Sequence, residues 1–173
     1  MEDTALPEAP STWYHLSLKP WKKLYVDKVK IPIKSRSHGE IRPPGMSVAP
    51  TVCQCLTAIP ERYGADKQLQ IYRVLVTAPS ALGPESNIWD LETTQEHVIT
   101  QEVLDVNGGK IVVEHAGWVM HDSNVVTAIK FAFKKLGKPL KPGDEPALWE
   151  IVEGEWKPRF TGGFDLARRL MTP

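Results

Sequence analysis

The stretch EHVITQEVLDVNGGKIVVEHAGWVM, residues 96–120, decides the fold that the sequence predicts. Asn107, Gly108 and Gly109 lie at its middle and can adopt the positive φ angles of a tight hairpin turn, and β-branched residues flank them on both sides. We therefore expect two strands joined by this turn. The first strand would lie centrally in a sheet, with Glu102 near the point where it leaves the sheet.

Length and composition predict one globular domain. A chain of 173 residues with 42% hydrophobic and 24% charged residues can fill one core of ordinary size. Its 21 basic and 21 acidic residues give a formal net charge of zero, so the chain as a whole has no field that attracts nucleic acid or a membrane surface. We expect neither as a general partner, and binding of a polyanion would need a local patch.

Cysteine usage and hydropathy predict a cytoplasmic protein. Cys53 and Cys55 are too close in sequence for an ordinary structural disulfide, which favours reduced thiols. A Cys-x-Cys pair can also bind zinc, but no second pair of ligands follows at matching spacing. The sequence has no cationic start followed by an apolar run and no apolar stretch long enough to cross a bilayer.

The rest of the chain predicts short strands and helices in mixed order. Residues 1–11 read as a flexible tail, and residues 12–173 as a single domain. Expected strands cover residues 13–18, 24–33, 46–49 and 69–77, with a further hairpin at 147–160. Expected helices cover residues 50–59 and 122–136, with a last helical turn or two at 164–171. The connection 78–96, which contains Trp89, is long enough to be a lid or a mobile loop. This order is typical of an α+β fold with mostly antiparallel sheets and a few short helices.

Three short segments resemble motifs of the ADP-ribosyltransferase superfamily, in the same order along the chain. WYHLS at residues 13–17 is similar to its first-strand motif, in which an aromatic residue precedes His-Gly-Ser or His-Gly-Thr. GMSVA at residues 45–49, which opens a helix, is similar to the second motif. TQEVL at residues 100–104 resembles the third, a strand that carries a catalytic glutamate. The resemblance covers roughly residues 13–119 and implies an ADP-ribosyltransferase-like fold.

The resemblance implies that NAD is the substrate and that ADP-ribose is transferred to an acceptor, which the sequence does not identify. His15 would bind the adenosine ribose with support from Ser17, and Ser47 would lie beside the nicotinamide. Glu102 would orient the nicotinamide ribose and stabilise the positive charge that develops when the glycosidic bond breaks. Tyr14, the aromatic residue of the first motif, is a further candidate for contact with NAD.

Arg42 is the remaining candidate for contact with NAD. It lies with Lys34 and Arg36 in the polar segment 34–45, where a guanidinium can hold phosphate oxygens. A solvated loop is the simpler explanation of these charges, and no residue spacing here separates the two. Two residues depart from the family pattern: Leu16 stands where the family has glycine, and Ser47 where tyrosine is expected.

Every candidate also has a purely structural explanation. A histidine on an apolar strand is often a hydrogen-bonded core residue, and Glu102 fits an exposed strand position. His97, His115 and His121 lack the spacing of metal ligands, so no metal is predicted. Two classes of function follow: an enzyme that acts on NAD, or a non-catalytic protein-binding module, such as an inhibitor or a viral, phage or bacterial mobile-element accessory. A pocket closed by Leu16 would favour the second class.

Overall fold

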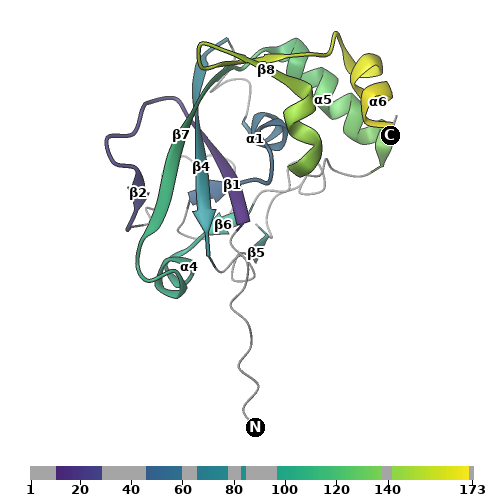
Figure 1. Ribbon diagram of the computed structural model, residues 1–173. Coiled ribbons are helices and arrows are strands. Elements are labelled where there is room, and N and C mark those ends of the chain that lie inside the picture. Colours follow the sequence, from purple (N-terminus) through teal and green to yellow (C-terminus); the bar gives the residue numbers. More distant parts are fainter. Residues whose placement is uncertain are drawn as a thin grey trace, which may run out of the picture.

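Two long antiparallel strands, β4 (Gln68–Val76) and β7 (Ile111–Met120), form the centre of the larger sheet (Figure 1). The computed structural model describes residues 11–28, 46–59, 66–77, 83–84, 97–137 and 142–171, which fold as one α+β domain. The expected fold class is confirmed.

The described strands form two sheets. The larger sheet has the order β1-β4-β7-β9-β8, with β2 also paired to β7, and the smaller has the order β3-β6-β5. Pairing is antiparallel except between β7 and β9. The remaining strands are β1 (Ser11–Ser17), β2 (Tyr25–Val26), β3 (Met46–Val48), β5 (Gly83–Pro84), β6 (His97–Ile99), β8 (Trp149–Val152) and β9 (Glu155–Pro158).

A bulge in β7 divides the larger sheet between two hydrophobic cores. Ile71 pairs with Gly117 and the next residue of β4, Tyr72, pairs with His115, so Ala116 is one extra residue on β7. Because side chains alternate between the faces of a strand, the extra residue moves the odd-numbered residues of β7 from one face to the other. Val119 therefore packs in the first core, whereas the buried odd-numbered residues before the bulge pack in the second.

Three helices contribute to the first core and lie on the same side of the sheet (Figure 1). They are α1 (Val52–Ala58), α5 (Ser123–Leu136) and α6 (Gly163–Met171). Asp122 caps α5, because its carboxylate accepts hydrogen bonds from the amides of Asn124 and Val125. Gly137 ends the same helix in the left-handed conformation, with φ of 68°. A 3-10 helix, η3 (Pro142–Leu148), leads into β8. No helix among the described residues is both long and apolar enough to span a membrane.

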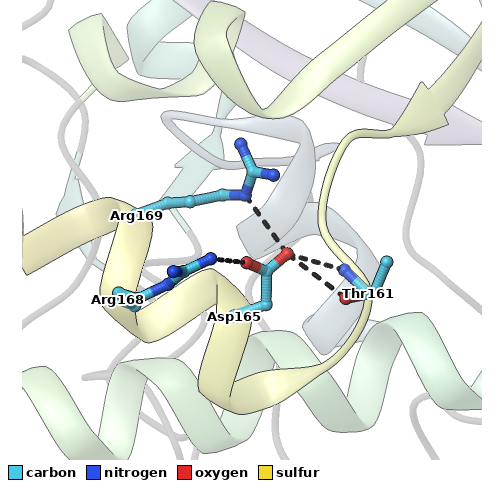
Figure 2. A network of polar contacts seen from close by, with 4 residues as sticks. All are labelled: Thr161, Asp165, Arg168 and Arg169. Atoms are coloured by element: carbon cyan, nitrogen blue, oxygen red, sulfur yellow. Dashed lines mark hydrogen bonds and ion pairs between the residues drawn. The ribbon is translucent and has the colours of Figure 1, made fainter.

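An acidic residue organises the start of α6 (Figure 2). The Asp165 carboxylate accepts hydrogen bonds from the Thr161 amide at 2.9 Å, from Arg168 Nη2 at 2.9 Å and from Arg169 Nε at 3.2 Å. The Arg168 guanidinium above all, with the Thr161 amide and Arg169, holds the pKa of Asp165 well below its usual range. A negative charge in the first turn of a helix also suits the helix dipole.

The prediction of a hairpin within residues 96–120 is wrong for the first of its two strands. Residues 97–99 form the short strand β6 in the smaller sheet, and the chain then enters helix α4 (Gln101–Val106). Thr100 caps this helix, Gln101 Nε2 donates to Asp105 Oδ1 at 3.0 Å, and Val103 and Leu104 are buried. These local bonds and the apolar pair favour a helical turn over a strand.

The predicted turn residues still change the direction of the chain. Asn107 is the C-cap of α4, and Gly108 and Gly109 have φ angles of 80° and 82°. The Gly109 amide donates to the Leu104 carbonyl at 2.7 Å, so these glycines end a helix before β7 begins.

The other expected elements are confirmed wherever the structure describes them, with small shifts in their bounds. The helix expected at residues 50–59 is α1, and its N-cap is Thr51, so Pro50 precedes the helix. The hairpin expected at 147–160 is β8 and β9, which turn at Glu153 and Gly154 with φ angles of 51° and 87°. Of the strand expected at 24–33, only β2 is seen, and residues 29–33 lie outside the described residues. Of the tail expected at 1–11, Ser11 belongs to β1 and residues 1–10 lie outside the described residues, as does all of the connection 78–96 except β5.

Replacing Gly117 by alanine should destabilise the fold by about 3 kcal/mol, from left-handed strain together with a steric clash. Gly117 has φ of 112°, and an added Cβ would collide with the carbonyl oxygen of Gly154. Urea unfolding followed by tryptophan fluorescence measures the change as a shift in midpoint at constant slope.

Gly108→Ala is the matched control. Gly108 has φ of 80°, but no atom lies within 4 Å of the position of an added Cβ, so only the backbone strain of about 1 kcal/mol is expected. Equal losses in the two variants would show that the close contact between Gly117 and Gly154 contributes nothing.

Candidate functional site

The three segments that resemble the ADP-ribosyltransferase motifs adjoin in space. Tyr14 of β1 and Ala49 exchange backbone hydrogen bonds of 2.8 and 3.0 Å. His15 Nδ1 lies 2.7 Å from the carbonyl oxygen of Ser47 in β3. Ser47 in turn pairs with Val98 of β6, and α4 with Glu102 follows β6 directly. The candidate site is this junction of β1, β3, β6 and α4.

A row of rings crosses the larger sheet beside this junction. Tyr72 of β4 is the cross-strand partner of His15 on β1 and of His115 on β7, so the three side chains share one face of the sheet. Trp21, from the chain between β1 and β2, stacks on Tyr72 with ring centroids 4.4 Å apart and an interplanar angle of 11°. The His15 ring lies 5.1 Å from the Trp21 ring. The ring row thus consists of His15, Tyr72 and His115, covered by Trp21.

Hydrogen bonds fix the orientation of the ring row. Because a carbonyl oxygen only accepts, the neutral His15 ring carries its proton on Nδ1 and donates it to Ser47, which leaves Nε2 as an acceptor. The Trp21 amide donates to the Tyr72 hydroxyl at 2.6 Å, and His115 Nε2 lies 2.8 Å from Gln70 Oε1. Burial lowers the pKa of His15, against a smaller raising effect of the bond to Ser47, so its imidazole is neutral at pH 7.

The predicted residues of the first strand lie on opposite faces of the sheet. His15 faces the ring row, whereas Tyr14 packs against the first core, with its ring 6.3 Å from that of Trp156. Leu16 is also buried in the first core, so its side chain does not fill the space beside His15. Ser17 Oγ donates to the Lys19 carbonyl at 2.8 Å and closes a local turn.

Glu102 does not lie on a strand, as the sequence predicted, but in the first turn of α4. Its side chain is exposed, and a carboxylate at this position is favourable for the helix dipole alone. The helix starts one residue after Thr100, the capping residue, which explains why the strand pattern failed here. Arg42, Lys34 and Arg36 lie outside the described residues.

A second polar cluster, which the sequence did not reveal, lies at the start of α1. The buried Glu145 carboxylate of η3 accepts hydrogen bonds from the amides of Val52 at 2.8 Å and Cys53 at 2.9 Å. Burial raises the pKa of Glu145. Burial, and after it the charge of Glu145, raise the pKa of the Cys53 thiol well above its ordinary value. Cys53 is therefore a protonated thiol, poorly suited to act as a nucleophile or metal ligand.

The described residues contain no group of histidine, cysteine and carboxylate side chains that could hold a metal ion. Cys53 and Cys55 are both buried and free of disulfide bonds, as expected for reduced thiols. Trp21, Tyr72 and Glu145 were missed because nothing in their local sequence distinguishes them from ordinary core or loop residues.

No protein-family model, curated protein or solved structure matches this chain. The site contains an imidazole with an acceptor nitrogen, stacked aromatic rings and, on helix α4, the exposed carboxylate of Glu102. Such a set suits a ligand that combines a planar ring with hydroxyl groups.

The stability of the protein should rise with pH just below the ordinary histidine pKa of 6.5, because of His15. The folded pKa of His15 is lowered, so within that window the unfolded chain binds a proton that the folded chain does not, and the free energy of unfolding increases as pH rises. His15→Gln should flatten this rise. Urea unfolding across this pH range measures the rise in both proteins, and an unchanged slope in His15→Gln would contradict the assignment.

Glu145 should have the opposite effect above its ordinary pKa of 4.5. Its folded pKa is raised, so the folded chain holds a proton that the unfolded chain has lost, and the parent loses stability as pH rises through the window. As pH rises over this range, the free energy of unfolding of the parent should fall relative to that of Glu145→Gln.

Proposed function

We propose that this protein binds NAD at the junction of β1, β3, β6 and α4 and transfers its ADP-ribose to an acceptor nucleophile. One observation carries the proposal: the segments around His15, Ser47 and Glu102, which are far apart in the sequence, adjoin in the fold. A cytoplasmic setting is proposed with it, supported by two buried cysteines that form no disulfide bond.

The proposed reaction breaks the glycosidic bond between nicotinamide and C1′ of its ribose. The bonding electrons leave with nicotinamide, whose ring nitrogen thereby becomes neutral, and an acceptor heteroatom bonds to C1′ and releases its proton. Positive charge accumulates on the ribose in the transition state, and a fixed carboxylate near it accelerates the reaction by stabilising that charge. Glu102 supplies this carboxylate in the proposal.

The other residues would bind and orient NAD. The free Nε2 of His15 accepts a hydrogen bond from a ribose hydroxyl, since Nδ1 is already bonded to Ser47. The Ser17 hydroxyl donates to the Lys19 carbonyl and accepts from the Lys19 amide at 3.3 Å, which leaves it one lone pair for a further donor. Leu16 does not fill the space near His15, because its side chain is buried in the core on the opposite face.

A second candidate is a non-catalytic protein-binding module, and two observations favour it. Trp21 covers the ring row, and Glu102 projects from an exposed helical turn rather than from a strand. Such a module has a possible contact surface at β8, the outer strand of the larger sheet, where Ile151 and Val152 are 54% and 39% exposed. Unpaired edge strands can bind an extended segment of another protein.

Incubation with NAD should release nicotinamide, and Glu102→Gln should lower the rate by about 10²–10³-fold, because the variant keeps the shape of the side chain but loses its charge. Chromatography of the reaction mixture measures nicotinamide. Saturating NAD should raise the melting temperature of both proteins, since a ligand that binds only the folded state stabilises it.

Asp105→Asn is the matched control, because Asp105 is an exposed carboxylate on the same helix. It should release nicotinamide at the parental rate. If the parent shows neither nicotinamide release nor a thermal shift, NAD is not its ligand and the protein-binding module becomes the better proposal. A thermal shift without release would retain NAD binding and exclude transfer to water.

A further inference from the structure

We infer that His15 and Tyr72 form the floor of a subsite for a planar heteroaromatic ring and that the indole of Trp21 occupies this subsite in the absence of ligand. The inference rests on the proposed function, since NAD carries two such rings, nicotinamide and adenine. It adds Trp21 as a removable cover and Tyr72 as a stacking surface, neither of which the sequence singled out for binding.

The geometry of the indole is that of a stacked ligand. Trp21 and Tyr72 are nearly parallel, at 11°, with centroids 4.4 Å apart. The other ring pairs recorded among the described residues are tilted or edge-on, with interplanar angles from 38° to 73°. Parallel offset stacking is one of the favourable arrangements for two π systems, and flat heteroaromatic ligands use it on tyrosine.

The segment that carries Trp21 is weakly held. It joins β1 to β2, and its side chains around Trp21 are exposed, namely those of Leu18, Lys19, Pro20, Lys22, Lys23 and Leu24. Trp21 itself is half-buried. Its backbone amide donates a hydrogen bond to the Tyr72 hydroxyl, and this bond holds the middle of the segment against the sheet. A segment with one half-buried anchor and otherwise exposed side chains opens locally at low cost in free energy.

Displacement of Trp21 would expose groups that suit a nicotinamide or an adenine. The Tyr72 hydroxyl would lose its hydrogen bond from the Trp21 amide. It could then donate a hydrogen bond to a ring nitrogen, or exchange hydrogen bonds with a carboxamide. The neutral His15 ring adjoins the same space, with its position fixed by Ser47. Lys22 and Lys23 follow Trp21 directly, and their charges favour a ligand that carries phosphates beside its ring.

If Trp21 covers the subsite, removing its ring should raise the affinity for NAD by an amount that can be estimated. A ligand that binds only the open state has its apparent dissociation constant raised by the reciprocal of the open fraction. Trp21→Ala removes the competing ring and should lower the apparent Kd for NAD by about tenfold or more if the closed form dominates. Leu24→Ala, at an exposed position of the same segment, is the matched control and should leave the Kd unchanged. Isothermal titration with NAD, adenosine and nicotinamide separately identifies which ring enters.

A measurement on the unaltered chain covers the case in which Trp21→Ala does not fold. The tryptophans are replaced by 5-fluorotryptophan, and the ¹⁹F resonance of Trp21 is assigned from its absence in Trp21→Phe. Addition of NAD should move this resonance towards the shift of a solvent-exposed indole, while those of Trp149 and Trp156, in the first core, stay in place.

The outcomes separate the inference from the proposed function. NAD binding with a fixed Trp21 resonance and no gain in Trp21→Ala would overturn the inference and leave the function standing. Ring binding by Trp21→Ala without any nicotinamide release would support the subsite and count against transfer. Failure of NAD, adenosine and nicotinamide to bind either the parent or a folded Trp21→Ala would overturn both.

Discussion

The one-residue shift in the pairing of β4 with β7 is the constraint on which the rest of the structure depends. Without Ala116 as an extra residue, the odd-numbered residues of β7 would all face one side, and Ile111 and Val113 could not share a core with Val74 and Val76. The bulge gives the sheet two apolar faces from one long strand. It also explains the positive φ of Gly117, where the β8–β9 turn approaches the backbone of β7.

The two faces have different compositions, and this difference determines where a ligand can bind. The first face is covered by α1, α5 and α6 and is filled with aliphatic and aromatic side chains. The second contains the ring row, whose polar atoms each need a partner: a main-chain carbonyl for His15, an amide for Tyr72 and a side-chain amide for His115. Polar groups with one or two hydrogen bonds can exchange these bonds for hydrogen bonds to a ligand at little cost in free energy.

Periodicity in the sequence predicted those elements whose buried side chains recur at a regular spacing along the chain. β4 alternates between two cores, and α5 has a continuous apolar stripe with a cap at Asp122 and a stop at Gly137, so local pattern and final structure agree. The prediction for residues 100–106 was wrong because TQEVLDV is compatible with a strand and with a capped helical turn, and the Thr100 cap favours the helix.

The candidate site could be predicted only in part, for a related reason. His15 and Ser47 come from short local motifs, and they do meet, whereas the stacking of Trp21 on Tyr72 joins residues that no local pattern links. The same holds for Glu145, whose partners precede it by 93 and 92 residues. Contacts of this kind depend on how the sheets and helices pack, and periodicity contains no information about that.

The hydrogen bonds of Glu145 also bear on the order in which the chain can fold during synthesis. The Val52 and Cys53 amides at the start of α1 have no helical partner of their own, and they are buried. Their acceptor leaves the ribosome more than ninety residues later, so the nascent segment up to β7 holds α1 with an incomplete end. Closing this long loop is a non-local step, so the end of α1 gains its acceptor only after Glu145 of η3 has been synthesised.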